Sequence, residues 1–170
     1  VTQLPPILDA DDVSPGTAQM VEAEGNDPVK YWVMLPAEYS THHEYPMVVA
    51  LRSRNLTAEQ TVNLWGGDAK RPDLGSQRGY IVIAPEYAPQ GQVDHTYGSP
   101  AHRIVLESLV DARKRFSVDS DRVYLAGHGM GADAAFDISI PRSALARETS
   151  ANRTGKENGR RAIVSPIART

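Results

Sequence analysis

The sequence predicts an α/β domain with a mostly parallel sheet, and two observations carry that prediction. Short, unbroken apolar runs recur along the chain, and helical patterns lie between them. Runs of four or five apolar residues without alternation are typical of strands buried on both faces, as parallel strands usually are. Strands that alternate with helices build βαβ units, which close right-handed into a sheet flanked by helices.

Four segments are predicted as strands, and two clear helical patterns separate them. The strands are expected at residues 30–36, 46–51, 80–84 and 122–126. Thr57 and Gln60 have the spacing of a capping box, which predicts a helix through about Trp65 that stops at Gly66-Gly67.

The second helix is predicted from Ser99, as its cap, to Phe116, with Pro100 in its first turn. Its apolar residues repeat at helical spacing, and Asp111 is expected on the polar side of that stripe. The stripe consists of Ala101, Val105, Leu109, Ala112 and Phe116.

Composition limits the classes of partner. The 170 residues suffice for one domain, and a net charge of −3 makes no general case for nucleic acid. No apolar run has the length of a membrane helix, so no membrane partner is expected. The chain has no cysteine, which excludes disulfides and Cys-based metal sites. We expect no metal and no cofactor.

The charge is unevenly spread and divides the chain into three segments. Residues 139–170 hold seven Arg or Lys against two Glu, with no aromatic residue. We therefore predict a lead-in or linker at 1–28, a domain at 29–138 and a basic, disordered tail at 139–170. Because the change is abrupt, a tail read out of frame is one hypothesis for it.

A glycine-rich turn follows the last predicted strand. Gly127-His128-Gly129-Met130-Gly131 lies directly after that strand and directly before an apolar helix. In this setting the pattern resembles the nucleophile elbow of α/β-hydrolases, Gly-x-Ser-x-Gly. The stretch 120–131 is similar to the fifth strand and elbow of esterase-type members, namely polyhydroxybutyrate-depolymerase-like, feruloyl-esterase-like and dienelactone-hydrolase-like proteins.

The resemblance extends over roughly residues 28–138. Residues 79–86 resemble the fourth strand of these proteins, and residues 31–51 resemble the strand pair before their oxyanion loop. It implies a partial α/β-hydrolase fold, incomplete after the elbow helix. It also implies that the third predicted strand runs into the oxyanion loop, and that the amide of Met130 is the second oxyanion donor.

The chain departs from the family pattern at the site itself. Gly129 occupies the nucleophile position and has no hydroxyl. Arg52 and Ser53 stand where the family usually has His-Gly, although an oxyanion hole needs amides rather than particular side chains. The family's triad continues with Asp or Glu and then His, but residues 139–170 contain no histidine and no aspartate. We expect no triad from this chain.

The remaining polar residues are given structural interpretations. His128 is expected to pack under neighbouring loops rather than act as a base. His42-His43-Glu44, and Asp94-His95 with His102, lack a strong metal-ligand spacing and are expected in solvated loops. Asp133 is explained by the positive end of the elbow helix.

Two functional hypotheses remain open. The first is a non-catalytic homologue that keeps a pocket at the C-terminal ends of the strands, either for binding, with a small ester or acyl compound as the ligand, or in a structural role. The second is an active carboxylic-ester hydrolase with an unrecognised nucleophile, for which Ser53, Ser99 and Ser108 are available. The strand at 122–126 would also lack an outer neighbour, which predicts self-association through the sheet edge.

Overall fold

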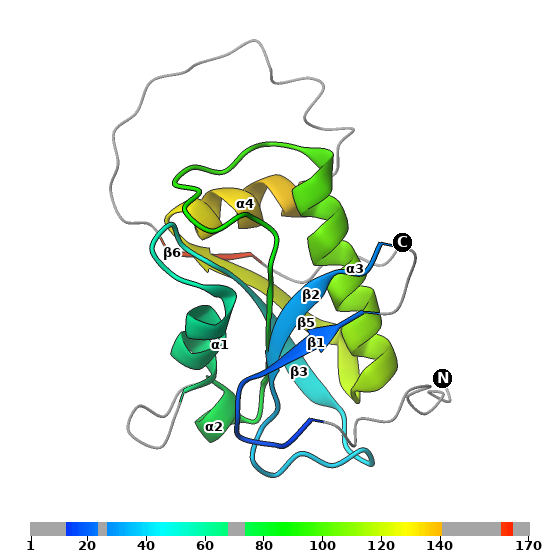
Figure 1. The fold of residues 1–170 in the computed structure, drawn as a ribbon. Helices are drawn as coiled ribbons and strands as arrows, with labels where there is room; N and C mark the ends of the chain where they lie inside the picture. Colours follow the sequence, from blue (N-terminus) through cyan, green and yellow to red (C-terminus); the bar gives the residue numbers. More distant parts are fainter. Residues whose placement is uncertain (1–12, 24–26, 68–73, 141–160, 165–170) are drawn as a thin grey trace.

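A computed structural model describes residues 13–23, 27–67, 74–140 and 161–164 (Figure 1). In this part of the chain one sheet lies between helices, which confirms the α/β prediction. None of the described helices is long and apolar enough to cross a membrane. The strands are β1 (Gln19–Glu22), β2 (Lys30–Met34), β3 (Tyr45–Leu51), β4 (Ile81–Pro85), β5 (Val118–His128) and β6 (Arg161–Val164). The helices are α1 (Ala58–Gly66), α2 (Leu74–Arg78), α3 (Ser99–Arg115) and α4 (Met130–Ser139).

The sheet is parallel at its centre and antiparallel toward both edges. Its order is β1-β2-β4-β3-β5-β6, and β3 pairs in parallel with both β4 and β5. The pairs β1–β2, β2–β4 and β5–β6 are antiparallel, so the sheet is mixed rather than mostly parallel. Because β3, β4 and β5 run the same way, the loops that follow them meet at one edge.

The core explains why the strand residues form unbroken apolar runs. Every residue of β3 is buried. Met47 and Val49 pack in the core cluster that includes residues of α3 and α4, whereas Val48 and Ala50 pack in the cluster that includes α1. Successive side chains of a strand point to opposite faces, so a strand covered on both sides needs apolar residues at every position.

The start of α1 confirms the capping box. The Thr57 hydroxyl accepts a hydrogen bond from the Gln60 amide at 3.1 Å, and the Gln60 side chain accepts one from the Thr57 amide at 3.0 Å. The cap of α3 was predicted wrongly. Gly98 rather than Ser99 is the N-cap, and no side chain caps this end.

Two strands lie in segments that the sequence analysis did not predict to be strands. β1 falls within residues 1–28, and β6 falls within residues 139–170. β6 pairs with Leu125–His128, so this stretch of β5 is not an exposed edge. The rest of the predicted tail, residues 141–160 and 165–170, lies outside the described residues. Self-association through the sheet edge stays a prediction.

A buried polar contact fastens α3 to the sheet. The Tyr31 hydroxyl of β2 donates a hydrogen bond to Asp111 Oδ2 at 2.7 Å, and Arg115 Nε donates to the same oxygen at 2.7 Å. Burial, reinforced by this bond, raises the pKa of Tyr31 far above its ordinary value. Asp111 was expected on the polar side of the helix; it is buried, because it accepts a bond from the strand beneath it.

Replacing Tyr31 with Phe should destabilise the protein by about 1–3 kcal/mol, because the buried Asp111 loses a hydrogen-bond donor. The matched control is Tyr124→Phe, which removes a hydroxyl from the half-buried ring on β5. Urea unfolding at neutral pH measures both. Equal stabilities for the two variants would contradict the role given to the Tyr31–Asp111 bond.

Candidate functional site

The centre of the candidate site is the sharp turn between β5 and α4. β5 ends at His128 and α4 begins at Met130, so Gly129 alone makes the turn. The Gly129 carbonyl accepts hydrogen bonds from the Ala132 amide at 2.8 Å and the Asp133 amide at 3.2 Å. The helix therefore starts within one residue of the strand, as an elbow requires.

Two flanking glycines let three backbone segments come together. A Cβ on Gly127 would lie 2.2 Å from the Gly131 carbonyl oxygen, and a Cβ on Gly131 would lie 2.2 Å from the Leu51 carbonyl oxygen. Neither position can hold any other residue unless the backbone moves. The end of β3, the end of β5 and the first turn of α4 are thus in direct main-chain contact.

Gly129 itself has the backbone conformation that an elbow imposes. Its φ of 56° and ψ of −124° form a combination that residues with a side chain rarely adopt. A Cβ built on Gly129 would lie 3.1 Å from Ser53 Oγ. The hydroxyl of the β3 loop therefore lies next to the space that a nucleophile's side chain would use.

The strand order, the parallel strands at the centre of the sheet and the elbow together identify the fold. The described part of this chain has the α/β-hydrolase fold. Solved structures agree. A ferulic acid esterase from Anaeromyces mucronatus superposes with a TM-score of 0.52 at 19% identity, over 82% of this chain and 59% of its own. An S-formylglutathione hydrolase from Agrobacterium tumefaciens superposes with a TM-score of 0.53 at 19% identity, over 75% of this chain and 54% of its own. An acylaminoacyl peptidase from Pyrococcus horikoshii superposes with a TM-score of 0.52 at 11% identity, over 76% of this chain and 22% of its own.

This chain therefore spans little more than half the length of the first two of these hydrolases. No family model matches its sequence, and no curated protein does. The similarity establishes the α/β-hydrolase fold, because identities below 20% do not carry a specific activity from one chain to another.

The loop after β3, where an α/β-hydrolase has its oxyanion loop, is fixed by Arg52. This side chain is 3% exposed. Its guanidinium donates hydrogen bonds to the carbonyls of Ser53 at 3.2 Å and Ala88 at 3.1 Å, and also to the Pro89 carbonyl. The Tyr87 hydroxyl donates to the Arg52 carbonyl at 3.0 Å. Arg52 thus joins the loop after β3 to the loop after β4 and does not project into the site.

Near the C-terminal end of α4, two histidines share one carboxylate. His95 Nε2 lies 2.9 Å and His102 Nε2 lies 2.7 Å from Asp137 Oδ2. The side chains of His95, His102 and Asp137 are 1%, 15% and 6% exposed. The prediction that His95 and His102 lie in solvated loops is therefore wrong. Asp94 is exposed, as expected.

The electrostatics of this cluster follow from its hydrogen bonds. Burial alone would raise the pKa of Asp137, but hydrogen bonds from both histidines and their charges outweigh burial and hold the pKa below its ordinary value. An ionised carboxylate only accepts, so both Nε2 atoms must donate. His95 Nδ1 is buried and has no hydrogen-bond partner among the described residues.

The other candidate residues are dispersed. His128 was expected to pack under neighbouring loops, but its side chain is exposed at the end of β5, where the strand pairs with Arg161 of β6. Ser108 is buried and donates to the Ile104 carbonyl at 2.8 Å, away from the elbow. Ser99 is exposed in the first turn of α3. Of the three available serines, Ser53 is the one that the fold brings to Gly129.

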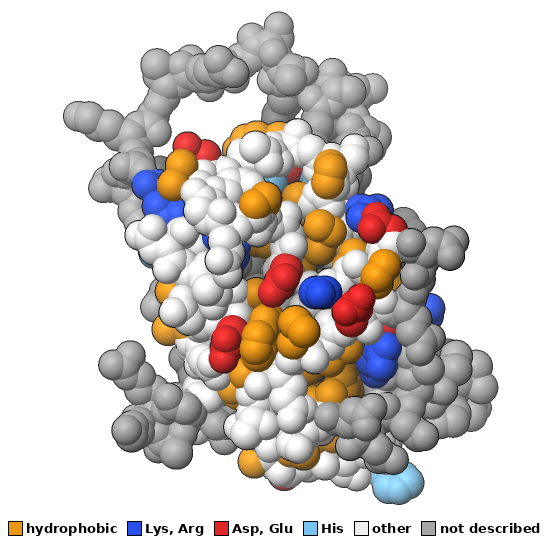
Figure 2. Space-filling view, in the orientation of Figure 1, with side chains coloured by type: hydrophobic (Ala, Val, Ile, Leu, Met, Phe, Trp, Pro, Cys, Tyr) orange, Lys and Arg blue, Asp and Glu red, His pale blue; other side chains and the backbone are white. Residues whose placement is uncertain are grey.

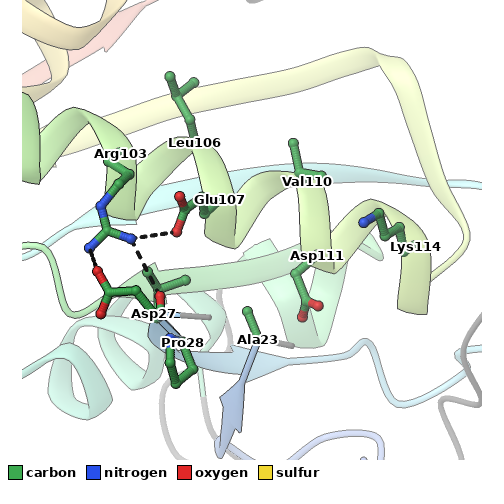
Figure 3. A pocket seen from close by; sticks show the side chains of 10 residues that line it. Ala23, Asp27, Pro28, Arg103, Leu106, Glu107, Val110, Asp111 and Lys114 are labelled. Atoms are coloured by element: carbon green, nitrogen blue, oxygen red, sulfur yellow. Dashed lines mark hydrogen bonds and ion pairs between the residues drawn. The ribbon is translucent and has the colours of Figure 1, made fainter. Parts of the chain in front are cut away.

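The described residues also form two hollows away from the elbow. One, of about 570 Å³, lies between α3 and the segment joining β1 to β2 (Figure 3). Arg103 lines this hollow and forms ion pairs with Asp27 at 2.6 Å and Glu107 at 2.8 Å. Leu106 and Val110 also line it, and both side chains are exposed. The other, of about 550 Å³, lies near the start of β3. On the face of the molecule that Figure 2 shows, hydrophobic and charged side chains are interspersed rather than gathered in one patch.

Within the described ranges, no three His, Asp or Glu side chains are arranged to hold a metal ion. The histidines at positions 42 and 43 are exposed in the loop before β3, as predicted. The acidic side chain of Asp133 is exposed in the first turn of α4, where the helix dipole favours it.

Gly127→Ala and Gly131→Ala should each cost more than about 3 kcal/mol or prevent folding, because the new methyl group collides with main chain that cannot move independently. Gly98→Ala is the control, since a Cβ there would lie 3.6 Å from the nearest atom. Thermal unfolding of the three variants tests this. An elbow variant as stable as Gly98→Ala would show that the close approach is not required.

Asp137 should make stability depend on pH in the acid range. Because its folded pKa is lowered, its contribution is complete above its unfolded pKa and is lost as pH falls through its folded pKa. The stability difference between wild type and Asp137→Asn should therefore shrink below about pH 4. Asp133→Asn is the control for removing a carboxylate from α4. Chemical unfolding from pH 3 to 7 gives the comparison, and a difference independent of pH would contradict it.

Proposed function

We propose that this chain is a non-catalytic protein of the α/β-hydrolase fold that binds a small carboxylic ester or acyl compound beside the elbow. The observation that carries the proposal is Gly129, which has the backbone conformation of an elbow nucleophile and no hydroxyl. Without a nucleophile, binding and oxyanion contacts alone would leave on the order of 10³–10⁴-fold acceleration over water, which ordinary assays miss.

The placement of the loops supports binding at this edge. In α/β sheets ligands usually bind outside the carboxyl ends of the strands. Here those ends carry the loop with Arg52 and Ser53 after β3, the loop with Tyr87 after β4, and Gly129 after β5. Arg52 and Tyr87 link two of these loops through main-chain carbonyls, so the surface is preorganised.

One observation favours the alternative, an active ester hydrolase. Ser53 Oγ lies 3.1 Å from the position of a Cβ on residue 129, so a hydroxyl is present where a nucleophile would act. An activated serine needs a base within hydrogen-bond reach. Two of the described histidines are engaged elsewhere, because His95 and His102 bind Asp137. His128 precedes Gly129 in the chain, and its side chain is exposed.

Labelling with a fluorophosphonate, read by intact mass, separates these functions. We expect no covalent adduct on the wild-type protein and no turnover of 4-nitrophenyl butyrate above the rate of Ser53→Ala. An adduct that disappears in Ser53→Ala would establish the active alternative instead.

Binding is tested by ligand-observed NMR with methyl butyrate. Ser53→Leu should abolish the signal, because the larger side chain fills the space beside Gly129. Leu64→Ser, which changes an exposed residue of α1, should retain it. Absence of binding to wild type, or equal binding to both variants, would contradict a ligand site at the elbow.

A further inference from the structure

The connection between β4 and α3, residues 86–98, passes across α4 (Figure 1), which it contacts through His95. We call it the wall segment. Arg52 holds its first part through the carbonyls of Ala88 and Pro89. Asp137 holds its later part through His95. The segment therefore has two polar anchors, one on the loop after β3 and one on α4.

The second anchor joins three elements at a single oxygen atom. His95 comes from the wall segment, His102 from the first turns of α3 and Asp137 from α4. Removing one partner from such a buried cluster leaves desolvated polar groups unpaired, which costs more than the pair gains over water. The cluster thus fixes the position of the wall segment relative to the elbow helix.

The anchored part of the wall segment also carries Tyr97, two residues after His95. This side chain is 73% exposed, yet its ring packs edge-on against the His95 ring with centroids 4.8 Å apart. Because the His95 ring binds Asp137, this contact places Tyr97 beside α4. Partial burial, followed by the charges of Asp133 and Asp137, raises the pKa of Tyr97. An exposed aromatic ring with a rigid backing makes contacts at low entropic cost.

We propose that Asp137 is a positioning residue of the ligand site: through His95 and His102 it fixes the wall segment so that Tyr97 meets a ligand that carries an aromatic ring. The ligand class rests on the proposed binding function. The anchoring role does not, because it concerns contacts within the chain.

Carbethoxylation of histidines by diethyl pyrocarbonate, read by peptide mass spectrometry, tests the anchor. His42, His43 and His128 are exposed and serve as references within the same molecule. In wild type His95 should react far more slowly than these three. Asp137→Asn should accelerate its reaction about tenfold or more by local opening, whereas Asp133→Asn should not. Fast reaction of His95 in wild type, or equal rates in the two variants, would overturn the anchoring role.

A second variant covers the case in which Asp137→Asn fails to fold. His102→Gln removes one of the two donors and keeps the Asp137–His95 bond. It should accelerate His95 modification by less than Asp137→Asn, without accelerating His42 or His43. Near-UV circular dichroism confirms that each variant remains folded. Unchanged His95 protection in folded His102→Gln would show that the cluster does not act as one anchor.

Ligand-observed NMR with methyl benzoate and methyl cyclohexanecarboxylate tests the role of Tyr97. The two esters have similar size, and only the first has an aromatic ring. Tyr97→Ala and Asp137→Asn should each lower the affinity for methyl benzoate about tenfold, in line with the loss of one aromatic contact. Tyr97→Phe should bind methyl benzoate as wild type does. Equal affinity for the two esters, or full binding by Tyr97→Ala, would overturn the aromatic preference. If neither ester nor methyl butyrate binds wild type, the proposed function fails, and the carbethoxylation result still decides the anchor.

Discussion

The main-chain contact among β3, β5 and α4 is the constraint on which the rest of the site depends. Gly127 and Gly131 have no room for a Cβ because backbone atoms of Gly131 and Leu51 occupy that space. Once these segments touch, the positions of Gly129 and of the loop that begins at Arg52 follow from strand pairing, since Leu51 and Gly127 are register partners. The geometry of the site is therefore set by main-chain packing before any functional side chain is considered.

The backbone conformation of the turn explains why glycine suits position 129. The conformation at Gly129 costs a glycine little, whereas a residue with a side chain would carry strain of order 1–3 kcal/mol there. A serine at this position must therefore be supported by its surroundings, while a glycine relieves the strain. With glycine at position 129, main-chain packing alone accounts for the turn between β5 and α4.

The sequence predicts those features that depend on local patterns. The runs at β3 and β4, the capping box at Thr57 and the elbow glycines all lie within short segments, and the structure has each of them. β1 was not predicted, because it is short and its stability comes from pairing with β2. The contacts of Asp137 join residues 35 and 42 positions apart, which no local pattern reveals. One signal existed nonetheless: Asp137 lies among the apolar residues on the inner side of its helix, and it proves to be buried and paired.

Different interactions fix the elbow and the wall segment. The elbow is held by main-chain contacts and by apolar side chains, whose packing tolerates exchange of similar residues. The wall is held by buried polar groups, namely Arg52 on carbonyls and Asp137 on two histidines, where removing one partner leaves another unpaired. Burying such groups gains little net stability, so their value lies in fixing one arrangement of the loops. The buried anchors therefore hold the loops beside Gly129 in one arrangement, which is the preorganisation that the proposed binding function needs.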